Sequence, residues 1–182
     1  ALGYQETVNF SFVEAAWERD FSGNTAPITL ANPIASQLSV MRSSLIGGLV
    51  NVLTVNRKRQ QDRVRAFEIG RCFLRDAAGT PVAGFQQPMR LAGLASGAAL
   101  PEQWGVAGRN VDFYDVKADV EALFPGEALV FEAASHAALH PGRAARILRN
   151  GTVIGHLGEL HPRWVQQYEL GAAPVVFELE LP

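Results

Sequence analysis

The stretch from Arg143 to Leu160, RAARILRNGTVIGHLGEL, decides the fold class. Two runs in which apolar and polar residues alternate flank the dipeptide Asn150-Gly151. This dipeptide favours a two-residue β-hairpin turn, because both residues tolerate a positive φ angle. The pattern therefore predicts at least one antiparallel pair of strands.

Alternation continues on both sides of this hairpin. In Thr7 to Val13, Val8, Phe10 and Phe12 alternate with polar residues, which predicts a half-buried strand. In the last strand, from Val175 to Leu181, every second residue from Val175 onward is expected to face the interior. The other expected strands cover residues 28–30, 64–73, 89–94 and 127–133.

Helical spacing marks the remaining segments. Apolar residues form one stripe between Ser43 and Gln60, and Asp112 is placed to cap a second helix. Phe113, Val116, Val120, Leu123 and Phe124 are its expected buried face, and Lys117 and Glu121 are expected to pair on its exposed side. Short helices are expected at residues 14–20 and from Pro162, with Gly171 just past the end. Because strands outnumber helices, we expect an α+β fold, a mainly antiparallel β-sheet flanked by helices.

Bulk composition fits a globular domain, with 48% apolar and 19% charged residues. The net charge of −2 gives no global attraction to nucleic acid or an acidic membrane. The single cysteine, Cys72, cannot form an internal disulfide, so we expect a cytoplasmic protein. No apolar run is long enough to cross a bilayer, so no membrane partner is expected. The chain starts without Met and stops directly after a strand, and we expect residues 1–182 to be a single domain excised from a longer chain.

Four stretches together resemble one family. They are LANPIASQLSVMRSSLIGGL (30–49), VRAFEIGRCF (64–73), DFYDVKADVEALF (112–124) and HPGRAARILRNGTVIGHLGELHP (140–162). In this order, and across nearly the whole chain, they are similar to the bacterial phenylalanyl-tRNA synthetase β subunit. The resemblance implies a class II aminoacyl-tRNA synthetase-like fold that has lost its active site.

The resemblance also implies partners. The catalytic α subunit would join this chain in an α2β2 assembly that charges tRNA with phenylalanine in the cytoplasm. ATP and Mg²⁺ would serve the holoenzyme, and tRNA would be met through it, while this fragment would hold no cofactor. The expected function is a non-catalytic core domain that supports assembly with the α subunit and is inactive alone.

Class II active sites use a strand motif, Phe-Arg-x-Glu, whose arginine binds the α-phosphate. The nearest match is Phe73-Leu74-Arg75-Asp76, in which Leu74 replaces the arginine. Arg75 comes one residue late, and a slip of one residue turns a strand side chain to the opposite face. The glycine-rich closing motif of the class is also missing. We therefore expect no catalytic, cofactor-binding or metal-binding residues, and the first alternative, a free-standing active ligase, is disfavoured.

The second alternative is a domain that contacts tRNA directly. The run RKRQQDRVR from Arg57 to Arg65 has five cations and one acid, a composition suited to a phosphate backbone. A solvated helix end followed by the start of a strand is the simpler interpretation.

Six residues are candidates for an interface with the α subunit: Arg42, Leu45, Gly47, Gly48, Glu68 and Arg71. Each glycine costs about 1 kcal/mol inside a helix. We therefore expect another backbone to approach there, unless the helix starts only near Leu49. Glu68 lies on a strand with Arg65 and Arg71, which predicts either buried or interface pairing or a strand near the sheet edge with charges in solvent.

His136 and His140 have the i, i+4 spacing that suits two zinc ligands on a helix. Pro141-Gly142 follows them directly, and no cysteine or acidic cluster accompanies them. Histidines in a surface turn are therefore the favoured interpretation. Cys72 is expected to be a buried thiol rather than a nucleophile.

Overall fold

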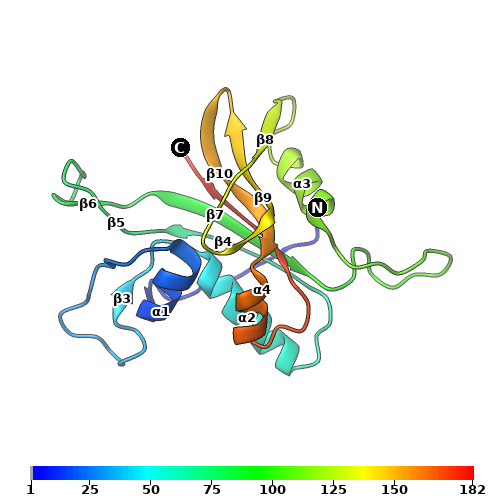
Figure 1. The fold of residues 1–182 in the computed structure, drawn as a ribbon, viewed down its shortest axis with the longest axis horizontal. Coiled ribbons are helices and arrows are strands. Elements are labelled where there is room, and N and C mark those ends of the chain that lie inside the picture. Colours follow the sequence, from blue (N-terminus) through cyan, green and yellow to red (C-terminus); the bar gives the residue numbers. More distant parts are fainter. Residues whose placement is uncertain (1) are drawn as a thin grey trace.

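The computed structural model describes residues 2–182 and has the expected α+β architecture (Figure 1). Its centre is a seven-stranded sheet, in which all neighbours are antiparallel except the parallel pair β1–β4. In spatial order the strands are β1 (Gln5–Glu6), β4 (Val64–Arg71), β7 (Met89–Ser96), β11 (Val175–Glu180), β10 (Thr152–Leu160), β9 (Leu139–Arg149) and β8 (Leu129–Ala133).

The predicted hairpin is confirmed as the pair β9–β10. Its turn has φ angles of 52° at Asn150 and 79° at Gly151. Thr152 pairs with Arg149 next to the turn, and the ladder runs on to Leu160 opposite Leu139 with two register shifts. In the sheet, β10 of the hairpin pairs with β11, and β9 pairs with β8. The hairpin therefore lies at the centre of a four-stranded part of the sheet.

Two small ribbons lie outside this sheet, namely β2 (Phe12–Val13) with β3 (Val40–Met41), and β5 (Leu74–Arg75) with β6 (Phe85–Gln86). The predicted strand from Thr7 to Val13 is therefore wrong over most of its length. Val8 is 89% exposed and Phe10 is 72% exposed, because Asn9 between them turns inward to bind Glu68. The predicted strand at residues 28–30 is also wrong, since Thr29 forms only an isolated bridge with Val40.

Helices cover the two faces of the sheet unequally. One face carries α2 (Ile46–Lys58), the π-helical turn η1 (Glu18–Ser22) that continues α1 (Ala15–Trp17), and α4 (Pro162–Gln167). The other face carries α3 (Phe113–Ala122), which contacts β10 and β11. β11 lies between both layers, so Val176 and Glu178 are buried together with Val175, Phe177 and Leu179. The expected one-sided burial of this strand is therefore wrong.

The start of α2 settles the question of its glycines. The helix begins at Ile46, so Gly47 and Gly48 lie inside it, and the alternative of a start near Leu49 is wrong. A Cβ atom at Gly47 would lie 2.8 Å from the Trp17 ring, and one at Gly48 would lie 3.1 Å from the Asn9 side chain. The close approach is confirmed, although the approaching groups are side chains of this chain rather than another backbone.

α3 begins as predicted. Asp112 caps it in a capping box with Asp115, and Lys117 pairs with Glu121 at 2.5 Å. Val116 and Val120 are fully buried, whereas Leu123 is 40% exposed because it follows the last helical residue. The prediction that Leu123 is buried is wrong. No helix within residues 2–182 is both long and apolar enough to span a bilayer.

Candidate functional site

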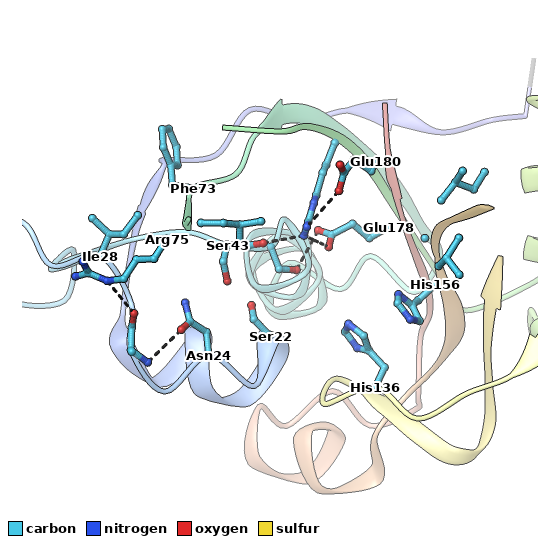
Figure 2. Close-up of a pocket in the computed structure, with 17 residues that line it drawn as sticks. Ser22, Asn24, Ile28, Ser43, Phe73, Arg75, His136, His156, Glu178 and Glu180 are labelled. Carbon is cyan, nitrogen blue, oxygen red and sulfur yellow. Dashed lines mark hydrogen bonds and ion pairs between the residues drawn. The ribbon is translucent and has the colours of Figure 1, made fainter. Parts of the chain in front are cut away.

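A cleft of about 510 Å³ opens on the α2 side of the sheet, between the central strands and the segment that precedes α2 (Figure 2). Its polar lining includes Ser22, Ser43, Ser44, Arg75, Arg90, His136, His156, Glu178 and Glu180. These residues come from distant parts of the chain, and of them only Arg75, as a phosphate-binding arginine, and His136, as a zinc ligand, were considered from the sequence.

Glu178 is the centre of the cleft wall. One oxygen, Oε1, accepts hydrogen bonds from the Leu45 amide at 2.6 Å and the Ser44 hydroxyl at 3.0 Å. The other, Oε2, accepts from Arg90 Nη1 at 2.9 Å. Leu45 is the N-cap of α2 and has no side chain that can cap the helix. The carboxylate of β11 therefore takes an amide of this N-terminus that would otherwise lack a partner.

A second buried carboxylate, Glu18, lies at the same place. It accepts from the Ser43 amide at 2.8 Å, the Ser43 hydroxyl at 2.5 Å and the Asn24 side chain at 2.8 Å. A helix N-terminus can bind an anionic ligand. Here the protein's own carboxylates already occupy that position.

The two cleft arginines are also engaged. Arg90 Nη1 donates to Ser43 O at 2.8 Å as well as to Glu178, and Nη2 lies 3.7 Å from Glu180. Arg75 donates to two backbone carbonyls, Ala26 O at 3.3 Å and Pro27 O at 3.4 Å, and lies on the ribbon β5 rather than on the main sheet.

The charged side chains that line this cleft are Arg75, Arg90, Glu178 and Glu180, so two guanidinium groups face two carboxylates. Arg90 is bound to Glu178, whereas Arg75 is exposed and bonded only to backbone carbonyls. The cleft therefore has no excess of positive charge for a triphosphate.

Two histidines close the other end of the cleft, with ring centres 4.8 Å apart (Figure 2). Burial is the main cause that lowers the pKa of His136, to about 4, and it also lowers the pKa of His156, with a further contribution from Arg90. His136 Nδ1 accepts from the Ala138 amide at 3.2 Å. Both rings are therefore neutral at neutral pH.

His140 does not join this pair. It lies on β9, where its Nδ1 accepts from the Gly142 amide, so His136 and His140 do not share a helix face. The favoured surface turn also needs correction, since His136 is partly buried in the cleft wall. Within residues 2–182, no three side chains of the metal-binding types come together.

The interface candidates divide into buried and exposed residues. Arg42 Nη1 and Glu68 Oε1 form a buried ion pair at 2.6 Å. Leu45, Gly47 and Gly48 are buried in the first turn of α2 or directly before it. Arg71 is exposed and donates to Gln87 O at 3.3 Å. Both interpretations of this strand are therefore right in part, with pairing inside the chain for Glu68 and a charge in solvent for Arg71.

Asn9 joins the buried candidates, and sequence reasoning missed it. Its Nδ2 donates to Glu68 Oε2 at 2.7 Å, its O accepts from Arg42 Nη1 at 3.5 Å, and its side chain packs on Gly48. Glu18 and Glu178 were missed as well, because their partners lie on other elements. For Glu178, an acid in an alternating strand pattern predicts solvent exposure.

The solved structures define the class of this fold. A pyrrolysyl tRNA synthetase, PylSc of Desulfitobacterium hafniense, superposes with a TM-score of 0.68 over 98% of this chain and 58% of that chain. The identity is only 12%, so the likeness establishes the fold alone, that of a class II aminoacyl-tRNA synthetase.

Sequence comparison narrows this class. The family model for the phenylalanyl tRNA synthetase beta chain CLM domain matches residues 1–181. Phenylalanine–tRNA ligase beta subunits of Aromatoleum aromaticum and Dechloromonas aromatica are 71% and 63% identical over 100% and 98% of this chain. The chain belongs to the phenylalanyl-tRNA synthetase β-chain CLM domain family, and it spans 23% of the length of these two relatives.

Proposed function

We propose that this domain is the non-catalytic core of a phenylalanine–tRNA ligase β subunit. It supports assembly with a catalytic α subunit in a cytoplasmic α2β2 enzyme that charges tRNA with phenylalanine. ATP and Mg²⁺ act at the α subunit. The observation that carries this proposal is Glu178 in the cleft wall, which accepts from the Leu45 amide at the N-terminus of α2 and from Arg90, one of the two cations that line the cleft.

Adenylation needs preorganised positive groups where charge develops on the phosphates. In this cleft, Arg90 is bound to Glu178 and to a backbone carbonyl, and Arg75 is bound to two carbonyls. Glu180, 58% exposed at its side chain, adds negative charge at the mouth. ATP would meet two carboxylates and would have to break the Arg90–Glu178 ion pair.

Amino-acid-dependent exchange of pyrophosphate into ATP tests the catalytic part. The domain alone, and the β subunit alone, should give no exchange above a control without protein, while the α2β2 enzyme should give it. Phenylalanine-dependent exchange by the isolated domain would contradict the proposal and favour a free-standing ligase.

Assembly requires a surface, and the segment Thr7 to Ser11 offers one. Val8 and Phe10 point outward on either side of the anchored Asn9, and Ile69, which follows Glu68 on β4, is 49% exposed. Large exposed apolar side chains on a fixed backbone are typical of protein interfaces. Most of the buried candidates, namely Arg42, Gly48 and Glu68, would then act by holding this segment rather than by touching the partner.

The substitution pair Val8→Ser and Phe10→Ser in the full β subunit tests this surface. We expect assembly with α to weaken by at least about tenfold, because the central apolar contacts of an interface carry most of its affinity. Val130→Ser with Val153→Ser is the matched control, since these valines are 53% and 45% exposed on β8 and β10. Assembly of the Val8/Phe10 variant at wild-type concentrations would place the interface elsewhere.

A further inference from the structure

A second cavity, of about 410 Å³, lies where the C-terminal end of α2 meets β1 and the start of β4. Its charged lining consists of three arginines, Arg59, Arg63 and Arg65, and no carboxylate lines it. The neutral polar residues of its wall are Gln5, Thr7, Asn56 and Gln61. No aromatic side chain lines the cavity, so it is not built to stack a base.

Two of the arginines are held in place at the cavity wall. Arg65 is 8% exposed at its side chain, pairs with Asp119 at 2.8 Å through Nη1 and donates to Ala99 O at 3.3 Å through Nη2. Arg63 donates to backbone carbonyls, Ala98 O at 3.1 Å and Ala99 O at 3.5 Å, and has no carboxylate partner. The positive charge of Arg63 is therefore not balanced by an acid within the described residues.

Arg59 completes the group from the other side. It follows α2 directly and is exposed, so its guanidinium group can turn toward a ligand. Arg57, from the same run of cations, instead faces the interior with its Nη2 3.4 Å from Ser96 Oγ. Three of the five cations of this run, Arg59, Arg63 and Arg65, therefore line the cavity.

Few negative charges lie near the three arginines of the cavity. Asp119 is engaged by Arg65, and the C-terminal end of α2 contributes about half a negative charge. Asp62, between Arg59 and Arg63 in the sequence, is exposed and does not line the cavity. The cavity remains cationic.

We propose that this cavity binds a phosphate group. Arg59 and Arg63 supply the charge, and Asn56 and Gln61 supply neutral donors. Guanidinium groups suit phosphate because their paired N–H groups match its oxygens. The phosphate belongs either to an RNA backbone or to a free anion, and the experiment separates these two sources.

Site-specific arginine modification in the α2β2 enzyme tests the binding. Phenylglyoxal labelling is followed by peptide mass spectrometry, with and without inorganic phosphate. We expect phosphate to slow the labelling of Arg59 at least about threefold. Arg163, exposed on α4, is the control and should label at the same rate in both samples. Equal labelling of Arg59 with and without phosphate overturns the proposal, as does an Arg59 that never reacts, because the cavity is then closed in the assembly.

Measurements of tRNA affinity over a range of salt concentrations distinguish the two sources of the phosphate, an RNA backbone and a free anion. If RNA supplies the phosphate, Arg59→Gln with Arg63→Gln weakens tRNA binding about 5–30-fold and lowers the salt slope by about one to two. Lys58→Gln with Arg163→Gln should change neither. Protection by inorganic phosphate with unchanged tRNA affinity assigns the site to a free anion. The pyrophosphate-exchange result does not depend on these variants, so the two proposals fail separately.

Discussion

The N-termini of α2 and α3 are both held by carboxylates, but the carboxylates come from different places. At α3, Asp112 accepts from the Tyr114 and Asp115 amides, and Asp115 accepts from the Asp112 amide. All of these groups lie within four residues. At α2, the acceptors are Glu18 and Glu178, and Glu178 lies 133 residues from the Leu45 amide that it binds.

The cap of α3 is therefore local in the chain, whereas the cap of α2 depends on tertiary contacts. The capping box of α3 stabilises its helix wherever the helix lies. The carboxylates at α2 bind η1, β11 and the start of α2 together, and they form only when these elements have packed. Glu178 also lines the cleft, so the N-terminus of α2 is already paired with a carboxylate where it borders this cavity.

Glu178→Ala should have the largest effect on stability. It leaves the Arg90 guanidinium group and the Leu45 amide without their partner in a buried place, and breaking a buried pair in this way costs about 3–5 kcal/mol. Urea unfolding measures the loss. Glu180→Ala is the control, since this acid on the same strand is 3.7 Å from Arg90 and largely exposed, and we expect at most about 1 kcal/mol. Similar losses in the two variants would mean that the tertiary cap adds no stability.

Glu18→Ala should have the second largest effect on stability. Three donors lose their acceptor, but no cation is left unpaired, so we expect a loss of about 2–3 kcal/mol in the free energy of unfolding. Glu14→Ala is the control, because Glu14 is exposed and caps nothing with its side chain. A loss as small as that of the control would leave Glu178 as the only tertiary cap.

Asp112→Ala should cost less, about 1 kcal/mol, because a local cap on an exposed helix end can be replaced in part by water. The comparison is with Glu121→Ala, which removes only the Lys117 pair and should cost about 0.3 kcal/mol. A loss for Asp112→Ala equal to that for Glu178→Ala would remove the distinction between local and tertiary caps.

The same distinction explains what could be predicted from the sequence. The hairpin at Asn150-Gly151, the cap at Asp112 and the helical stripe after Ser43 depend on neighbours in the chain, and all three predictions are confirmed. Val8 and Phe10 alternate as buried strand residues do, yet Asn9 between them finds its partners in Glu68 and Arg42. Their outward orientation is therefore decided by tertiary contacts that alternation does not reveal.

The carboxylates at the start of α2 follow the same rule. The sequence prediction of an inactive site, from Leu74 and the missing closing motif, did not involve them. The pairs that Glu178 forms with Arg90 and Glu18 forms with Ser43 join residues that are 88 and 25 positions apart. Nothing near either acid in the chain distinguishes it from an acid on the surface.

The smallest expected effect is a dependence on pH at α3. The hydrogen bond from Arg109 is the main cause that lowers the pKa of Asp115, to about 2. Because the folded pKa lies below the ordinary value near 4, the stabilisation is present above about pH 4 and is lost as the pH falls toward about 2. The difference in free energy of unfolding between wild type and Asp115→Asn should therefore shrink over this range.

The effect of salt on the free energy of unfolding should also differ between the two helix N-termini. The Arg109 side chain is 57% exposed, so added salt should reduce the Asp115 contribution. The loss caused by Glu178→Ala should change little with salt, since Glu178 and Arg90 are 10% and 18% exposed at their side chains. A salt response that is equal at the two helices would contradict the view that one carboxylate acts at the surface and the other within the core.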